Sequence, residues 1–144
     1  MKNKNKTTII VDIDGTISEK TDRDIYDYSR VMEDMPKKDI IKLVKLLYLQ
    51  WNDIVFCSGR EDSCMDATKQ WIRKYVFDGI ETPIELYMRK KGDNRPDHIV
   101  KREIYMNKIA PRHDVWFVLD DRNSVVDMWR ELGLTCLQVQ KGDF

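Results

Sequence analysis

The chain has 144 residues, enough for a single domain over residues 1–144 with a sizeable hydrophobic core. Lysine and arginine number 25, as do aspartate and glutamate. The resulting net charge of zero excludes binding to nucleic acid through overall basic charge but leaves room for a local basic groove. The three cysteines lack CxxC spacing, which excludes a common structural zinc site and predicts reduced thiols in a cytoplasmic compartment.

Strand-like and helix-like segments alternate along the chain. Apolar runs rich in β-branched residues predict strands at 7–13, 53–57, 84–88, 115–119 and 135–139. Apolar residues at helical spacing predict helices at 36–48, 62–75, 97–109 and 124–132, with Pro36 in a first turn and Asp97 as an N-cap. The segment 18–34 reads as loop with a short helical turn. This alternation predicts an α/β fold with a doubly wound, mostly parallel sheet.

Polar residues follow three of the predicted strands. Asp12 and Asp14 come at the end of the first strand, Ser58 follows the second, and Asp120 and Asp121 end the fourth. Ligands bind beyond the carboxyl ends of the strands in such sheets, so these side chains are expected to converge. Because residues two apart in a strand point to one side, Asp12 and Asp14 are expected to lean toward one point.

Carboxylates crowded at one site repel one another and predict a bound Mg²⁺, which prefers oxygen ligands. Beside that ion Asp12 can attack phosphorus and form an aspartyl-phosphate, while Asp14 can transfer protons. Ser58 and the backbone at Thr16 can hold phosphoryl oxygens. Lys101 is expected to face the same site. The chemistry predicted by these residues is phosphoryl transfer.

Taken together, these residues resemble a known signature. Asp12-x-Asp14-Gly15-Thr16, Ser58-Gly59-Arg60, Lys101 and Asp120-Asp121 are similar, in order and spacing, to the motifs of the haloacid dehalogenase (HAD) superfamily. Further motifs resemble the 3′-phosphatase domain of bacteriophage polynucleotide kinase–phosphatase. They are Arg23-x-x-Tyr26-Asp27, Arg89-x-x-Gly92-Asp93-x-Arg95, Ile109-Ala110-Pro111, Met128-Trp129-Arg130 and Gly142-Asp143-Phe144.

The resemblance implies an enzyme of nucleic-acid repair that removes 3′-phosphates from polynucleotide ends. It implies that Asp12 is the nucleophile and Asp14 the general acid and base. The implied ligands of Mg²⁺ are Asp12, the backbone carbonyl of Asp14, Asp120 and Asp121. The implied phosphate-binding residues are Ser58 with Gly59, Thr16 and Lys101. The implied contacts to the phosphate or the adjacent nucleotide are Arg23, Arg60 and Arg89.

The segments from Thr16 to Pro36 and from Arg60 to Ile84 are too short to hold a cap domain. The site is therefore expected to be open enough for the end of a polymer. The basic stretch that includes Arg95 can follow a phosphodiester backbone. The chain has no GxxxxGK[ST] sequence, so no 5′-kinase activity is expected.

Three alternatives remain open at this stage. The first is a phosphatase of the same superfamily that acts on mononucleotides or another small phosphomonoester. The second is a phospho-receiver domain, in which the phosphoryl group persists on aspartate. The third is a catalytically inactive nucleic-acid-binding domain. The sequence also leaves open the choice between DNA and RNA and the formation of a homodimer.

Overall fold

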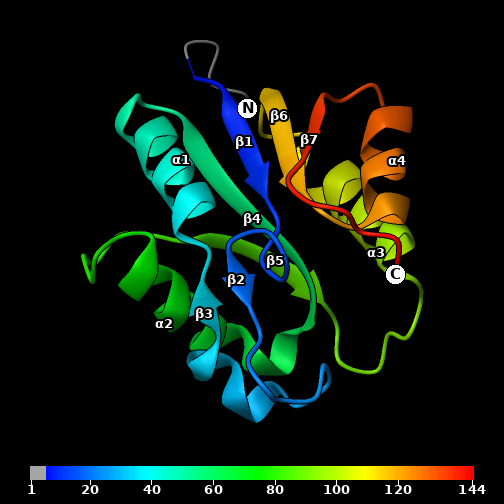
Figure 1. Ribbon diagram of the computed structural model, residues 1–144. Helices are drawn as coiled ribbons and strands as arrows, with labels where there is room; N and C mark the ends of the chain where they lie inside the picture. Colours follow the sequence, from blue (N-terminus) through cyan, green and yellow to red (C-terminus); the bar gives the residue numbers. More distant parts are fainter. Residues whose placement is uncertain (1–5) are drawn as a thin grey trace.

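The computed structural model describes residues 6–144; the first five residues of the expected domain lie outside the described part. A five-stranded sheet runs through the centre of the molecule (Figure 1). Its strand order is β5 (Glu85–Arg89), β4 (Asp53–Glu61), β1 (Thr8–Val11), β6 (Val115–Asp120) and β7 (Cys136–Gln138). Every neighbouring pair in this sheet is parallel, as the alternation of strands and helices predicts.

Strand β1 lies in the middle of the sheet, and all four of its residues are buried. Ile10 pairs with Val55 of β4 on one side and with Val118 of β6 on the other. A strand covered on both faces favours apolar side chains, which explains Ile9, Ile10 and Val11; the buried hydroxyl of Thr8 forms a hydrogen bond with His113 Nδ1 at 2.9 Å. The next strand of the sheet along the chain, β4, lies on one side of β1, and the later strand β6 lies on the other side. In α/β sheets a crevice forms at the carboxyl end of the strand where the order reverses in this way.

Helices cover both faces of the sheet (Figure 1). Helices α1 (Lys38–Leu49) and α2 (Met65–Tyr75) lie on one face, after the 3₁₀ segments η1 (Tyr28–Glu33) and η2 (Asp62–Cys64), respectively. Helices α3 (Asp97–Ile104) and α4 (Asn123–Glu131) lie on the other face, and α3 continues into the π-helical turn η3 (Tyr105–Ile109). The structure thus has the three layers of the predicted α/β class.

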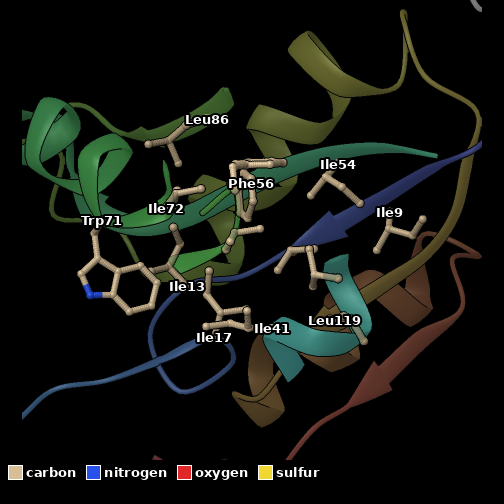
Figure 2. Close-up of a cluster of buried hydrophobic side chains, with 14 of the residues drawn as sticks. Ile9, Ile13, Ile17, Ile41, Ile54, Phe56, Trp71, Ile72, Leu86 and Leu119 are labelled. Carbon is tan, nitrogen blue, oxygen red and sulfur yellow. The ribbon is translucent and has the colours of Figure 1, made fainter. Parts of the chain in front are cut away.

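The two faces of the sheet carry separate hydrophobic clusters. On the face of α1 and α2, one cluster extends from Ile9 of β1 past Phe56 of β4 to Ile72 and Trp71 of α2 (Figure 2). On the other face, Val118 packs with residues of α4 that include Trp129. In α2 the buried positions Thr68, Trp71 and Ile72 follow the spacing of one helical face, so the helix forms where its apolar stripe can be covered.

Three local expectations differ from the structure. Strand β4 extends through Glu61, so Ser58, Gly59 and Arg60 lie within the strand and not after its end. Pro36 does not begin a helix, because it pairs with Ser18 in a small hairpin of β2 (Ser18–Glu19) and β3 (Met35–Pro36). Asp97 is the first residue of α3, and its side chain binds arginines instead of capping the helix.

The connections that precede α1 and β5 are small, as expected. The first holds the β2–β3 hairpin and η1, and the second holds η2 and α2, so neither forms a cap domain over the sheet. The cysteines are Cys57, Cys64 and Cys136, and all three are buried as free thiols. Within residues 6–144, no helix has both the length and the apolar character needed to cross a bilayer.

Candidate active site

The chain turns sharply where β1 ends, and this turn presents the two leading aspartates. The carbonyl of Ile13 accepts hydrogen bonds from the backbone amides of Thr16 and Ser18, each at 3.1 Å. Gly15 adopts a left-handed conformation with φ of 80°. Asp12 and Asp14 line the same pocket, but their carboxylates have different partners. The two side chains therefore face the same pocket, as expected, but their carboxylates do not meet at one point.

Lys101 of α3 joins two strand ends. Its buried Nζ donates to Asp12 Oδ1 at 2.7 Å and to Asp120 Oδ2 at 2.9 Å. Burial alone would lower the pKa of Lys101, but the carboxylates of Asp12 and Asp120 outweigh it and raise that pKa well above its usual value. Lys101 is therefore a permanent cation, and the structure places it in the site as the sequence predicts.

Asp12 is nearly enclosed. Its second oxygen, Oδ2, accepts a hydrogen bond of 3.1 Å from Thr16 Oγ1. Burial and the nearby charge of Asp120 raise the pKa of Asp12, and Lys101 opposes this shift. These contacts fix the orientation of the Asp12 carboxylate before any substrate binds, which favours nucleophilic attack in one direction.

Three carboxylates form a candidate metal site. Asp12, Asp120 and Asp121 each bring one oxygen into a cluster whose atoms all lie within 4.8 Å of one another. Asp120 is held by the indole Nε1 of Trp129 at 3.1 Å and by the backbone amide of Asp121 at 2.8 Å. An all-oxygen set of this kind fits a hard divalent cation. The side chain of Asp14 is not part of the cluster, and a role for its backbone carbonyl stays a prediction.

The side chain of Asp121 lies so close to Gly15 that no larger residue fits at position 15 without a shift. A Cβ on Gly15 would lie 2.0 Å from Asp121 Oδ2. Gln140 donates to the same carboxylate oxygen at 3.3 Å and accepts a hydrogen bond of 2.9 Å from Lys37. Burial raises the pKa of Asp121, and the hydrogen bond from Gln140 opposes the shift. Gln140 and Lys37 were not predicted from the sequence, because nothing local distinguishes them from surface residues.

Asp14 belongs to a network of arginines. Arg60 donates from Nε to Asp14 Oδ2 at 2.8 Å and from Nη2 to Asp14 Oδ1 at 2.7 Å. Arg23 Nη2 lies 3.6 Å from Asp14 Oδ1. Burial would raise the pKa of Asp14, but the hydrogen bonds and charge of Arg60, with the charge of Arg23, lower it. Asp14 is therefore ionised in this arrangement.

Asp34, which the sequence did not single out, anchors both arginines. This buried carboxylate accepts hydrogen bonds from Arg60 Nη2 at 2.6 Å and from Arg23 Nε at 2.7 Å. Arg60 also donates to Thr68 Oγ1, and Trp71 Nε1 donates to the backbone carbonyl of Asp34. A buried acid with two buried guanidinium partners is a fixed support for the groups that it holds.

Arg89 and Arg95 line the pocket but already have partners. Arg89 donates to the carbonyl of Gly59 at 2.8 Å and to the carboxylate of Asp97. Asp97 also pairs with Arg122 Nη1 at 3.1 Å. Arg95 is largely exposed and binds Asp93 and Glu103. The structure shows these two arginines ordering the loop between β5 and α3, and contact with a substrate stays a prediction for both.

Ser58 and Thr16 lie beneath the pocket surface. Both are fully buried, and neither belongs to the residues that line the pocket. Ser58 Oγ accepts a hydrogen bond of 3.1 Å from the backbone amide of Arg60, while Thr16 donates to Asp12. Gly59 does line the pocket. In this arrangement the two hydroxyls position their neighbours, and phosphate binding by them stays a prediction.

The pocket that contains these groups has a volume of about 780 Å³. Its walls come from the segment after β1, the end of β4, the loop before α3, the end of β6 and the last residues of the chain. Charged side chains dominate the lining, with Asp12 and Lys101 at its base and Arg122 on its wall. A pocket of this size and charge suits a phosphorylated ligand with an anionic extension.

Comparison with known proteins identifies the family. Residues 6–144 match the family described as "Polynucleotide kinase PNKP phosphatase domain". The chain belongs to this family. Its members carry the HAD-type phosphatase fold, and the chain is therefore a phosphatase domain related to enzymes that act on nucleic-acid ends. This confirms the resemblance on which the sequence analysis relied.

Individual relatives agree with the family assignment. A protein of Autographa californica nuclear polyhedrosis virus, named "Putative bifunctional polynucleotide kinase/RNA ligase", is 39% identical over 127 residues, which are 86% of this chain and 18% of the viral protein. Two solved structures of the Pnkp1/Rnl/Hen1 complex, one described as an RNA repair complex, each contain a chain that is 36% identical with a TM-score of 0.88. This chain is covered completely and spans 46% and 50% of those two chains.

Proposed function

We propose that the chain is a Mg²⁺-dependent phosphatase that removes 3′-phosphates from polynucleotide ends. The observation that carries this proposal is the Asp12 carboxylate, fixed by Lys101 at 2.7 Å within a cluster of three acids at the base of an open, arginine-lined pocket. The relatives' names refer to RNA ligase and RNA repair, which favours RNA ends as substrates.

The first chemical step assigns separate roles to the two aspartates. A carboxylate oxygen of Asp12 attacks phosphorus, and the bond from phosphorus to the 3′-oxygen of the substrate breaks. Asp14 donates a proton to this leaving oxygen. The products of the step are a free 3′-hydroxyl group and a phosphoryl group on Asp12. Splitting the hydrolysis at this point replaces one very slow reaction with two faster ones.

The second step regenerates the site. Asp14, now a carboxylate, removes a proton from a water molecule that attacks the phosphorus of the phospho-aspartate. The bond from phosphorus to Asp12 breaks, and inorganic phosphate leaves. A Mg²⁺ ion held by Asp12, Asp120 and Asp121 would offset negative charge on the phosphoryl oxygens, and Lys101 offers a second, permanent positive charge.

Asp14 must gain a proton before the first step, although Arg60 and Arg23 keep its pKa low in the structure. A bound phosphate dianion would raise the pKa of Asp14. A like charge nearby raises the pKa of a carboxylate, and a phosphate that attracts the two guanidinium groups also weakens their hold on Asp14.

The test compares matched substrates. We expect many turnovers of phosphate release from a 3′-phosphorylated oligonucleotide in Mg²⁺, and none in EDTA. The same oligonucleotide with a 5′-phosphate should be a poor substrate. Preference for a nucleoside monophosphate would contradict the polynucleotide assignment and favour the small-molecule phosphatase. Release of at most one phosphate per chain would contradict turnover and favour a receiver domain.

A further inference from the structure

An aromatic side chain projects at the mouth of the pocket. Tyr26 is 76% exposed, lies between β2 and η1, and lines the same pocket as Asp12. Its neighbour Ile25 is 50% exposed and lines the pocket as well. Single exposed rings are common on soluble proteins, so exposure alone does not assign a role to Tyr26.

Arg23 connects the backbone near Tyr26 with Asp14. Arg23 Nη1 donates to the carbonyl of Asp24 at 3.2 Å and lies 3.5 Å from the carbonyl of Ile25. The same guanidinium group lies 3.6 Å from Asp14. The backbone amide of Tyr26 donates to Asp24 Oδ1 at 2.8 Å. The backbone at Tyr26 is thus held close to Arg23, which in turn lies beside the proposed general acid.

A second exposed ring in the pocket has a partner already. Phe144 is 68% exposed, and the guanidinium group of Arg122 lies 4.8 Å from its ring centroid. Among residues 6–144, no ring or cation packs in this way on Tyr26. Tyr28 also lines the pocket, but it is half-buried and packs against the core, so Tyr26 is the most exposed ring of the pocket.

We propose that the base of the 3′-terminal nucleotide stacks on Tyr26 while its 3′-phosphate lies at Asp12; this inference rests on the proposed polynucleotide substrate. Every base offers a flat face to an aromatic ring, so the contact favours an end that carries a terminal base without selecting which base it is. Ile25 extends the apolar surface beside the ring. The Arg23 side chain contacts both the backbone beside Tyr26 and the carboxylate of Asp14, so it lies between the proposed base-binding ring and the proposed general acid.

The test uses a substrate that lacks only the stacking partner. Two single-stranded oligonucleotides with 3′-phosphates are compared, one with an ordinary terminal nucleotide and one with an abasic terminal residue. We expect the wild-type protein to prefer the substrate with the base by about tenfold in kcat/KM. Tyr26→Ala should remove this preference by slowing only the base-bearing substrate, and Tyr26→Phe should retain it.

Trp51 provides a matched control, because it is an aromatic residue that is 80% exposed, follows α1, and does not line the pocket. Trp51→Ala should retain the full preference for the base. Equal rates on the two substrates with wild-type protein, or an equal loss on both in Tyr26→Ala, would overturn the stacking inference alone. Failure of the wild-type protein to release phosphate from either substrate would overturn the proposed function itself.

Discussion

Arg60 holds Asp14 through two hydrogen bonds, from Nε at 2.8 Å and from Nη2 at 2.7 Å. Because the planar guanidinium group matches a carboxylate in a way that an ammonium group does not, Arg60 fixes the direction in which Asp14 points. Arg60→Lys keeps the charge and loses this two-point contact. We expect kcat for phosphate release to fall by about 100-fold, since small misplacements of a catalytic group cost that much.

Arg30→Lys is the control for this substitution. Arg30 lies on η1, forms ion pairs with the exposed side chains of Asp22 and Glu33, and does not line the pocket. Its replacement should leave kcat unchanged. Full activity of Arg60→Lys, measured under the same steady-state conditions, would show that orientation of Asp14 by Arg60 is unimportant.

Asp34 should contribute strongly to stability. Asp34→Asn removes the charge between two buried guanidinium groups and leaves Arg23 and Arg60 with too little compensation. Breaking a buried ion pair on one side costs about 3–5 kcal/mol, so we expect the free energy of unfolding in urea to fall by about 3 kcal/mol or more. Asp22→Asn, which removes an exposed partner of Arg30, should leave that free energy unchanged. Equal effects of the two substitutions would refute the role given to Asp34.

Gly15 and Gly79 separate backbone strain from steric contact with Asp121. Both glycines have positive φ, 80° and 79°, so alanine costs about 1–2 kcal/mol of backbone strain at either position. Only at Gly15 would the added Cβ meet Asp121 Oδ2; at Gly79, which does not line the pocket, no atom of the described residues outside the adjoining chain lies within 4 Å. We expect Gly15→Ala to abolish activity and weaken Mg²⁺ binding measured by calorimetry, while Gly79→Ala keeps both.

Similar losses in the two glycine variants would contradict a specific conflict with Asp121. A normal Mg²⁺ affinity in Gly15→Ala would also show that Asp121 moves away without harm. The two variants can be compared directly because alanine causes the same backbone strain at both positions.

The fold was largely predictable because its signals are local and repeated. The buried run at β1 and the stripe of α2 identify the elements, and polar residues at strand ends locate the site. The hairpin that contains Pro36 was missed, because two-residue strands have too few positions to form a pattern. The end of β4 was also missed, since Gly59 suggests a turn but lies opposite Asp97 within the extended strand.

The supporting groups of the site were harder to predict than its acids. Asp12 and Asp120 stand out because they end apolar strands, where a carboxylate is otherwise costly. Asp34 lies in a polar segment and becomes important only when folding brings Arg23 and Arg60 together across 11 and 26 residues of chain. Likewise, Gln140 reaches Asp121 from the end of the chain, and no periodicity marks that contact. Such long-range polar contacts leave no local signal.

The role of Asp12 is tested most directly by Asp12→Asn, assayed for phosphate release from a 3′-phosphorylated oligonucleotide in Mg²⁺. We expect wild-type protein to turn over many times and the variant to be slower by roughly 10⁴-fold or more, as for other removed nucleophiles. Circular dichroism should show an unchanged fold, because Lys101 keeps Asp120 as a partner. Sustained turnover by the folded variant at a rate near that of wild type would contradict the nucleophilic role of Asp12.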